Sequence, residues 1–393
     1  LASGNNEDLK KLQSATRNEL PHETYLELAN WYLDLGAYKD AKAVLSAGPQ
    51  NPESMYWSAF LEYKSGGDAY KTIIEHANNL SAELVFPFRP ASSEIFEWVA
   101  TQTDNWKPRY YLALIYRGAK DQTKALTWIK ACGDKPDFAP FYVIRAELTG
   151  STNYDDLKKA ASLQPNQWIY GKRLFEQALK NKDYKFALTT ATSYHQRFRT
   201  NSNLIMMHAK ALLLNGQYKA CTDLLSKSSI LPYEGSTDAR QVYWGAWILS
   251  ALEQIQQKKY SSALKSIEKS KRWPEQLGVG KPYDADIDLR SEDLIEYAAL
   301  KGSGNASKAA QKLNGIQERK DGNSPTGLLA YALAEKLKGN NSESIKIIDS
   351  YIQSTNGIAF AKWCREVIEH GSSTIEILPE QEKIGNGLIR ILK

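Results

Sequence analysis

Few residues of this sequence have the types and spacing that chemistry requires, and the most suggestive of them lie in one stretch rich in Gly and Pro. Gly278-Val279-Gly280-Lys281 is similar to the end of a phosphate-binding loop, whose backbone amides cradle a nucleotide phosphate. That motif needs Gly five residues before Gly280 and Ser or Thr after Lys281. Glu275 and Pro282 occupy those positions, so the sequence excludes a phosphate loop.

The same stretch continues with Asp284, Asp286 and Asp288, at the spacing with which a calcium-binding loop begins. The Gly required after the third acid is Leu289, and the twelfth position holds Ile295 in place of Glu. We therefore favour a structural role over a metal site. Carboxylates that precede a helix accept hydrogen bonds from its unpaired amides and complement its dipole.

A set of basic and aromatic residues forms the candidate binding site. Its members are Arg89, Trp98, Trp106, Arg109, Tyr110 and Arg145, around one interruption of the helical pattern, with Lys281 and Tyr283 in another. Guanidinium and aromatic groups together make adaptable surfaces for carboxylates, peptides or sugars. The alternative, which we favour, is that Arg89 and Arg145 hold irregular backbone carbonyls while the rings pack against one another.

The other reactive residue types give no catalytic or metal-binding pattern. The five histidines are scattered, and none has a Cys or an acidic cluster at ligand spacing. Cys132, Cys221 and Cys364 are an odd number at wide spacing, which indicates buried small side chains rather than disulfides or zinc ligands. No Gly-x-Ser-x-Gly motif is present. We predict no cofactor, no metal and no enzyme activity for this chain alone.

Composition narrows the class of protein further. The chain has 393 residues, 42% hydrophobic and 24% charged, which suits two or three globular domains or one elongated repeat array. Its net charge of +5 comes from interspersed residues of both signs, so no basic block could follow a nucleic-acid backbone. No apolar run is long enough to cross a membrane.

One helix–turn–helix pattern recurs along the chain and would position these residues. In Leu28–Ala41, small and apolar residues form a helical stripe, Gly36 ends the first helix, and Ala41 lies where the second helix crosses closely. The crossing positions of successive copies are Ala41, Ala125, Ala187, Cys221, Ala263, Ala309 and Ser344. Weaker pairs are expected at 55–79 and 138–163.

This pattern resembles the tetratricopeptide repeat, since Cys221 follows Ala187 by 34 residues (221 − 187), which is the standard period. The resemblance covers roughly residues 23 to 354, with irregular repeat lengths and without the turn Tyr at positions 122, 306 and 341. It implies an all-α fold, a right-handed α-α superhelix, in which stacked pairs share one continuous core. It also implies binding of a protein or peptide.

Two interruptions and the C-terminus depart from the repeat. The first interruption, 84–90, is extended by its prolines, and the second, 273–284, is too rich in Gly and Pro for an ordinary connection. We expect a repeat region over 1–370, with a possible sub-boundary near 164–166. The tail, 371–393, is expected to be non-helical, because apolar residues alternate on both sides of Gly385-Asn386-Gly387, as in a short β-hairpin.

The interruptions carry a closer resemblance, through Phe86-Pro87-Phe88-Arg89, Trp106-Lys107-Pro108-Arg109 and Leu277-Gly278-Val279-Gly280-Lys281-Pro282-Tyr283. These motifs are similar to the C-terminal half of large Bacteroidetes proteins in which a mutarotase-like β-sandwich precedes a tetratricopeptide region. The resemblance implies an accessory helical region, with its own upstream domain or a carbohydrate as a possible partner, and an exported or periplasmic location. The start at Leu1 also suggests a piece of something longer.

Two functions therefore remain open. The first is a helical interaction or scaffolding region that binds a protein, a peptide or its own upstream domain. The alternative is an accessory region of a carbohydrate-active or carbohydrate-binding protein.

Overall fold

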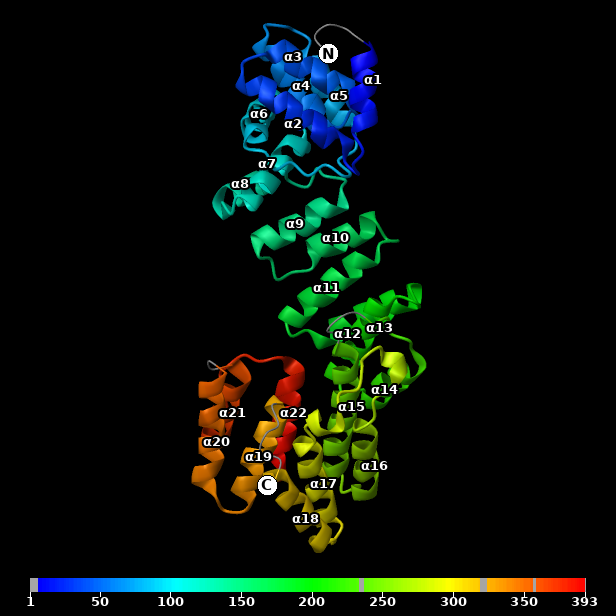
Figure 1. Ribbon diagram of the computed structural model, residues 1–393, viewed down its shortest axis with the longest axis vertical. Coiled ribbons are helices and arrows are strands. Elements are labelled where there is room, and N and C mark those ends of the chain that lie inside the picture. The colour runs from blue at the N-terminus through cyan, green and yellow to red at the C-terminus, as the bar shows by residue number, and fades with distance from the viewer. Residues whose placement is uncertain (1–5, 233–236, 319–323, 356–357, 393) are drawn as a thin grey trace. The chain divides into compact units, whose positions relative to one another are not determined.

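The computed structural model describes residues 6–232, 237–318, 324–355 and 358–392, and every regular element in those ranges is an α-helix or a short 3-10 helix. The chain forms two compact units, 1–170 and 171–393, which divide within helix α11 (Trp168–Lys180). Each unit is a stack of helix pairs (Figure 1). The predicted all-α fold of repeated helix pairs is confirmed, and the division lies a few residues after the expected sub-boundary.

Unit 1 contains four helix pairs, α2/α3, α4/α5, α7/α8 and α9/α10, with α6 inserted after the first interruption. The helices are α1 (Asn6–Ala15), α2 (Pro21–Asp34), α3 (Tyr38–Ala47), α4 (Pro52–Lys64), α5 (Tyr70–Asn79), α6 (Pro90–Gln102), α7 (Trp106–Gly118), α8 (Gln122–Ala131), α9 (Ala139–Thr149) and α10 (Asp155–Leu163). The two weaker pairs expected from the sequence are α4/α5 and α9/α10, so both are confirmed.

Unit 2 continues the pattern and ends in a helix that belongs to no pair. Its elements are α12 (Tyr184–Arg197), α13 (Ser202–Leu214), α14 (Tyr218–Lys227), α15 (Asp238–Gln256), α16 (Tyr260–Ser270), η1 (Glu275–Leu277), η2 (Asp284–Asp286), α17 (Arg290–Gly302), α18 (Ala306–Glu318), α19 (Pro325–Leu337), α20 (Asn341–Ser354), α21 (Ala359–His370), α22 (Pro379–Ile389) and η3 (Arg390–Leu392). Helix α15 has 19 residues, which accounts for one of the lengthened repeats.

The turn within most pairs has the same backbone structure, although the closing hydrogen bond does not occur after Gly150 in the α9/α10 turn. A residue with positive φ follows the first helix, and the next amide donates to the carbonyl five residues before it, as from Ala37 to Tyr32 at 2.9 Å. This hydrogen bond, together with the left-handed residue before it, is typical of the Schellman motif, which satisfies the last carbonyls of a helix. Glycine occupies the left-handed position in several copies, but Lys120, Lys182 and Lys258 occupy it in others.

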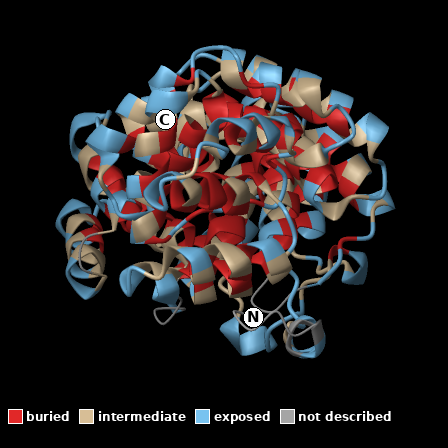
Figure 2. Ribbon diagram, turned by 90° about the horizontal axis from the view of Figure 1, so that it is seen from above, coloured by how far each residue is buried: buried red, intermediate tan, exposed pale blue. Residues whose placement is uncertain are grey.

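The small residues at the helix crossings are buried, as the close packing of two helices in the repeat requires. All seven predicted crossing residues, from Ala41 to Ser344, are buried. The turn Tyr fills the gap between pairs, since a Cβ on Gly302 of α17 would lie 2.4 Å from the ring of Tyr260 on α16. Each unit thus has its own apolar core, and buried residues gather on the helix faces that meet other helices (Figure 2).

The C-terminal tail corrects the sequence-based expectation. No strand occurs within the described part of 371–393, and α22 is a helix that packs inside unit 2, so the predicted non-helical hairpin is wrong. Ile384 and Leu388, one helical turn apart, are both buried. The two glycines that resembled a hairpin turn are instead points of close helix contact: a Cβ on Gly385 would lie 2.6 Å from Trp363.

The second interruption is a packed part of unit 2. The amide of Ile230 donates to the carbonyl of Gln276 at 2.8 Å, which joins this loop to the α14–α15 connection. Gly278 has φ +65° and a Cβ there would lie 2.5 Å from the carbonyl oxygen of Ile230, so a side chain would not fit. The expected capping role is confirmed for Asp288, which accepts from the backbone amide of Arg290 at 3.1 Å.

Candidate docking surfaces

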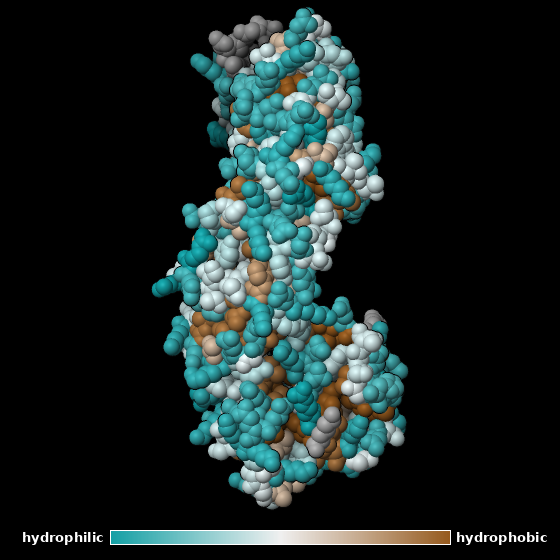
Figure 3. All heavy atoms as spheres, turned by 180° about the vertical axis from the view of Figure 1, so that it is seen from behind, coloured by the Kyte–Doolittle hydropathy of each residue, from teal (hydrophilic) through white to brown (hydrophobic). Residues whose placement is uncertain are grey.

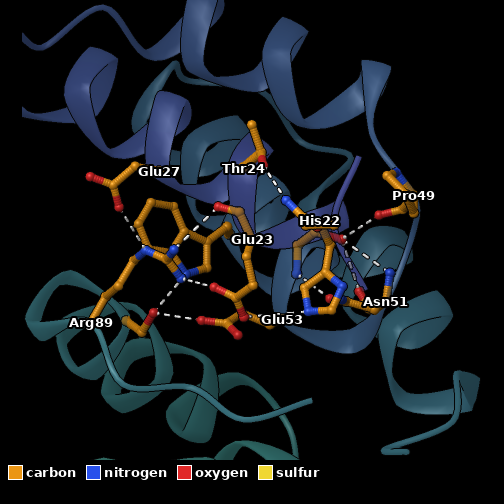
Figure 4. A network of polar contacts seen from close by, with 12 residues as sticks. His22, Glu23, Thr24, Glu27, Pro49, Asn51, Glu53 and Arg89 are labelled. Atoms are coloured by element: carbon orange, nitrogen blue, oxygen red, sulfur yellow. Dashed lines mark hydrogen bonds and ion pairs between the residues drawn. The ribbon is translucent and has the colours of Figure 1, made fainter. Parts of the chain in front are cut away.

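Arg89, the first residue of the predicted binding set, is an anchor within unit 1. Its guanidinium reaches α2, where it pairs with the carboxylate of Glu23 at 2.5 Å and that of Glu27 at 3.3 Å (Figure 4). It also donates to the backbone carbonyl of Glu23 at 3.2 Å. The side chain is almost fully buried, so its charge is used inside the protein.

The other two arginines of the set also hold backbone, as the favoured alternative predicted for Arg145. Arg109 donates to the carbonyls of Ala100, Thr103 and Asn105, and so fixes the turn between α6 and α7. Arg145 donates to the carbonyl of Gly133 at 2.7 Å and pairs with Asp134 and Asp156.

The three rings of the set in unit 1 lie in packed aromatic clusters. Trp98 stacks on Tyr63 with ring centroids 4.9 Å apart. Trp106 and Tyr110 are buried against each other and against Phe138. Such pairs stabilise the core and leave little ring surface for a ligand.

The last two members, Lys281 and Tyr283, belong to unit 2. Lys281 pairs with Asp284 at 2.6 Å, and this acid begins η2 rather than capping α17. Tyr283 is 85% exposed and is the one ring of the predicted set with a free face. The eight residues are thus divided between two units. In unit 1 the arginines hold backbone carbonyls and pair with acids, and the rings pack in aromatic clusters.

A different surface of unit 1 has the properties of a docking site. From Leu84 to Arg89, side chains alternate strictly: Leu84, Phe86 and Phe88 are exposed, while Val85, Pro87 and Arg89 are buried. The exposed fractions of the three apolar residues are 64%, 57% and 65%. We call Leu84, Phe86 and Phe88 the apolar ridge. Contiguous exposed apolar side chains of this size mark interaction surfaces.

Arg89 fixes the ridge to the rest of unit 1. Its guanidinium lies 4.5 Å from the ring centroid of Phe88 and also pairs with the carboxylate of Glu27 on α2. Trp31, one turn beyond Glu27 on α2, and Leu35, the residue after the helix, are 60% and 79% accessible. Residues four apart share one helix face. Trp31 thus exposes a large apolar side chain on the α2 face whose Glu27 pairs with Arg89.

A buried polar network lies beside the Arg89 anchor (Figure 4). The indole of Trp57 donates to the hydroxyl of Ser92 at 3.1 Å, and that hydroxyl donates to the carboxyl of Glu53 at 2.8 Å. Burial raises the pKa of Glu53 to about 7. Burial also acts on Glu23, but hydrogen bonds from His22 and Arg89 outweigh it and lower the pKa of that carboxyl.

Unit 2 has a groove that its own chain fills. Helices α13, α15, α17 and α19, each the first of a pair, pack side by side with one another and with α21, and α22 contacts all five. Figure 1 shows α22, in red, between α19 and α21 on one side and α15 and α17 on the other. Figure 3 shows apolar residues, in brown, reaching the surface along a hollow of this unit.

A pair of histidines in unit 2 was not anticipated. His195 of α12 and His208 of α13 meet with their Nδ1 atoms 2.9 Å apart. Burial and the neighbouring ring lower the pKa of His208 to about 4, and burial also lowers the pKa of His195. The two histidines are 13 positions apart and lie on different helices, so the sequence alone did not predict their contact.

The described ranges contain neither a metal-ligand cluster nor a membrane-spanning helix. No group of three or more His, Cys, Asp or Glu residues there is placed to hold a metal ion. None of the described helices has the length and apolar character needed to span a bilayer. All three cysteines are buried, and burial raises the pKa of the Cys132 and Cys221 thiols to about 12, which suppresses thiolate chemistry.

No protein-family model matches the chain, and no curated protein matches it. Among solved structures, it is similar to a tetratricopeptide repeat protein from Parabacteroides merdae, at 8% identity and TM-score 0.39, over 67% of this chain and 99% of that one. Yeast Tom70 matches at 11% identity and TM-score 0.33, over 91% of each chain. The P58(IPK) TPR domain matches at 13% identity and TM-score 0.21, over 88% and 97%. These likenesses are loose, so the helical-repeat class rests on the helix pairs and turns described above.

Proposed function

We propose that this chain is an interaction region that binds an extended segment of another protein along the apolar ridge of unit 1. The observation that carries the proposal is three large apolar side chains held outward on a segment whose alternate residues are buried. A segment anchored in this way loses little conformational freedom on binding, which favours affinity.

The ridge is suited to an extended partner. Within the described part of the chain, no hydrogen bond engages the backbone amides of Phe86 and Phe88. A partner strand could pair with such amides while its apolar side chains lie on the ridge. Its charge is expected to be basic, because two exposed acids lie at the ridge: Glu83 directly precedes Leu84, and Glu27 pairs with the anchor Arg89.

Of the two other expected partners, an upstream domain fits this proposal better than a carbohydrate does. A segment of the chain's own upstream domain could occupy the same ridge. The carbohydrate-linked alternative has less support, because Trp106 and Tyr110 are buried in packed clusters where a sugar cannot stack on them.

The test is a binding titration with two labelled synthetic peptides, in which Val and Phe alternate with Thr between Lys-rich or Glu-rich ends. We expect the Lys-ended peptide to bind, and the double substitution Phe86→Ser and Phe88→Ser to weaken it roughly ten-fold or more. Leu231→Ser, at an exposed Leu of unit 2, is the matched control and should change nothing. Equal binding of both peptides, or no effect of the ridge substitutions, would refute the proposal.

A further inference from the structure

We infer that the groove of unit 2 is a helix-binding site, and that α22 occupies it as an internal ligand which a helix of the same chemistry can replace. The inference concerns a different surface from the apolar ridge and does not depend on the function proposed there.

The face of α22 that enters the groove is shaped by its sequence. Successive residues of a helix are about 100° apart, so Ile384, Gly385, Gly387 and Leu388 form one continuous face. The two apolar residues are buried in the groove. The two glycines lie at its walls, because a Cβ on Gly385 would meet Trp363 of α21 and one on Gly387 would meet Leu252 of α15, each at 2.6 Å.

The groove side is equally specific. Gly245 of α15 faces Ile384 of α22, since a Cβ at Gly245 would lie 3.7 Å from Cδ1 of Ile384, in ordinary van der Waals contact. Lysines at the groove edge meet acids at the entrance of α22: Lys210 pairs with Glu380 at 3.0 Å and Lys182 with Glu376 at 3.1 Å. The site therefore selects a helix that acids precede. This helix has small residues where it meets the groove walls and apolar residues where it meets the groove floor.

Helix α22 is poorly suited to exist outside the groove. It has 11 residues, fewer than the ~12–15 at which isolated helices become marginally stable. Gly385 and Gly387 each disfavour a helix by about 1 kcal/mol relative to Ala. Its helical structure thus depends on the contacts of the groove, as for a peptide that folds when it binds.

The connection between α21 and α22 would be released together with α22. Helix α21 ends at His370, followed by Gly371 in the left-handed conformation, and no regular element occurs before Pro379, although Ile375 and Ile377 of the connection pack against the core of unit 2. Release would expose apolar groove residues, including Leu252, Leu329 and Trp363, each within 3.7 Å of a Cβ built on an α22 glycine. The ligand class is an amphipathic helix with an acidic N-terminal end and small residues on its apolar face.

The test uses the full chain and a fluorescent peptide of residues 371–393, with binding followed by anisotropy. In the wild-type chain, the tethered helix competes at an effective concentration in the mM range, so the peptide should bind weakly. Gly387→Leu in the chain prevents its own α22 from seating but leaves the groove unchanged. We expect this variant to bind the wild-type peptide roughly ten-fold or more tightly than the wild-type chain does.

Two altered peptides serve as controls. Glu380→Lys in the peptide should weaken binding to the Gly387→Leu chain, and a peptide that itself carries Gly387→Leu should not bind. If the Gly387→Leu chain does not fold, Ile384→Ala, which removes bulk from α22, replaces it. A folded variant with rapidly exchanging α22 amides that does not bind the peptide would overturn the inference. Loss of folding in both variants would also overturn it, because α22 would then be an integral part of the unit.

Discussion

Glu53 and Glu292 are fully buried carboxyl groups in the first turns of α4 and α17. Each accepts a hydrogen bond at 2.8 Å, Glu53 from Ser92 and Glu292 from the indole of Trp244. A helix N-terminus favours the charged form of such a group, but burial disfavours it. Burial dominates in both cases and raises the pKa of each to about 7.

The raised pKa of Glu53 predicts that unit 1 becomes less stable as the pH rises. Between its ordinary value of 4.5 and about 7, the folded chain keeps a proton that the unfolded chain has released. The contribution of Glu53 to the free energy of unfolding is therefore complete below pH 4.5 and is lost as the pH rises through about 7. Glu53→Gln should remove this dependence and stabilise unit 1 at pH 8 by on the order of 2 kcal/mol.

The measurement is urea unfolding of wild-type and variant chains at several pH values between 5 and 8. Gln keeps an acceptor for the Ser92 hydroxyl, so the comparison isolates the charge. Glu83→Gln, at an exposed carboxyl beside the apolar ridge, is the control and should leave the pH profile unchanged. A Glu53→Gln chain with the same profile as wild type would mean that Glu53 is ionised at neutral pH in the folded protein.

Among the elements, the turns of the repeat show how far a local motif constrains a residue. A left-handed residue is needed between the two helices of each pair, and Gly is best suited to it. Lys258 nevertheless adopts φ +59° at the turn from α15 to α16. The stacked helices on either side impose this conformation, at a cost of about 1–2 kcal/mol for a residue with a Cβ.

Lys258→Gly should therefore stabilise unit 2, by about 0.5–1 kcal/mol once the greater flexibility of Gly in the unfolded chain is subtracted. The adjacent Gln257 has φ −81°, where Gly relieves no strain. Gln257→Gly is thus the matched control, and it should destabilise the same unit. Thermal unfolding monitored by circular dichroism measures both changes, and a destabilising Lys258→Gly would show that this turn is not strained.

In the whole molecule, the two units have separate apolar cores that share no residue. Stability in helical repeats is carried by neighbouring pairs, so a change in one core should not spread through the chain. We predict two unfolding transitions. Glu53→Gln should move only the transition of unit 1, and Ile384→Ala should lower only that of unit 2, by about 2–4 kcal/mol for a buried Ile.

Hydrogen exchange during a urea titration assigns each transition to its unit, since α4 reports on unit 1 and α15 on unit 2. A single transition that responds to both substitutions would contradict the prediction. It would indicate that α11, in which the two units divide, couples their unfolding.

Most of the architecture could be predicted, because the information that specifies it is local. Ala41, Ala187 and Cys221 mark helix crossings since only a small side chain lets two backbones approach, and all three are buried. The turn residues follow from the same repeat. Even the wrong prediction for the tail had a local origin, because Gly385-Asn386-Gly387 is a good hairpin turn in isolation.

The candidate sites could not be predicted in the same way, because they depend on contacts between distant residues. Arg89 and Trp98 have the chemistry of a binding surface, yet Arg89 pairs with Glu23, which is 66 positions earlier in the chain, and Trp98 stacks on Tyr63. The extended course of 84–90 was predicted from its prolines, but not which of its side chains face solvent. Composition and period specify helix pairs, since a helix buries one stripe of residues. Which exposed side chains remain without a partner, and which helix fills the groove, follow from how the pairs pack together.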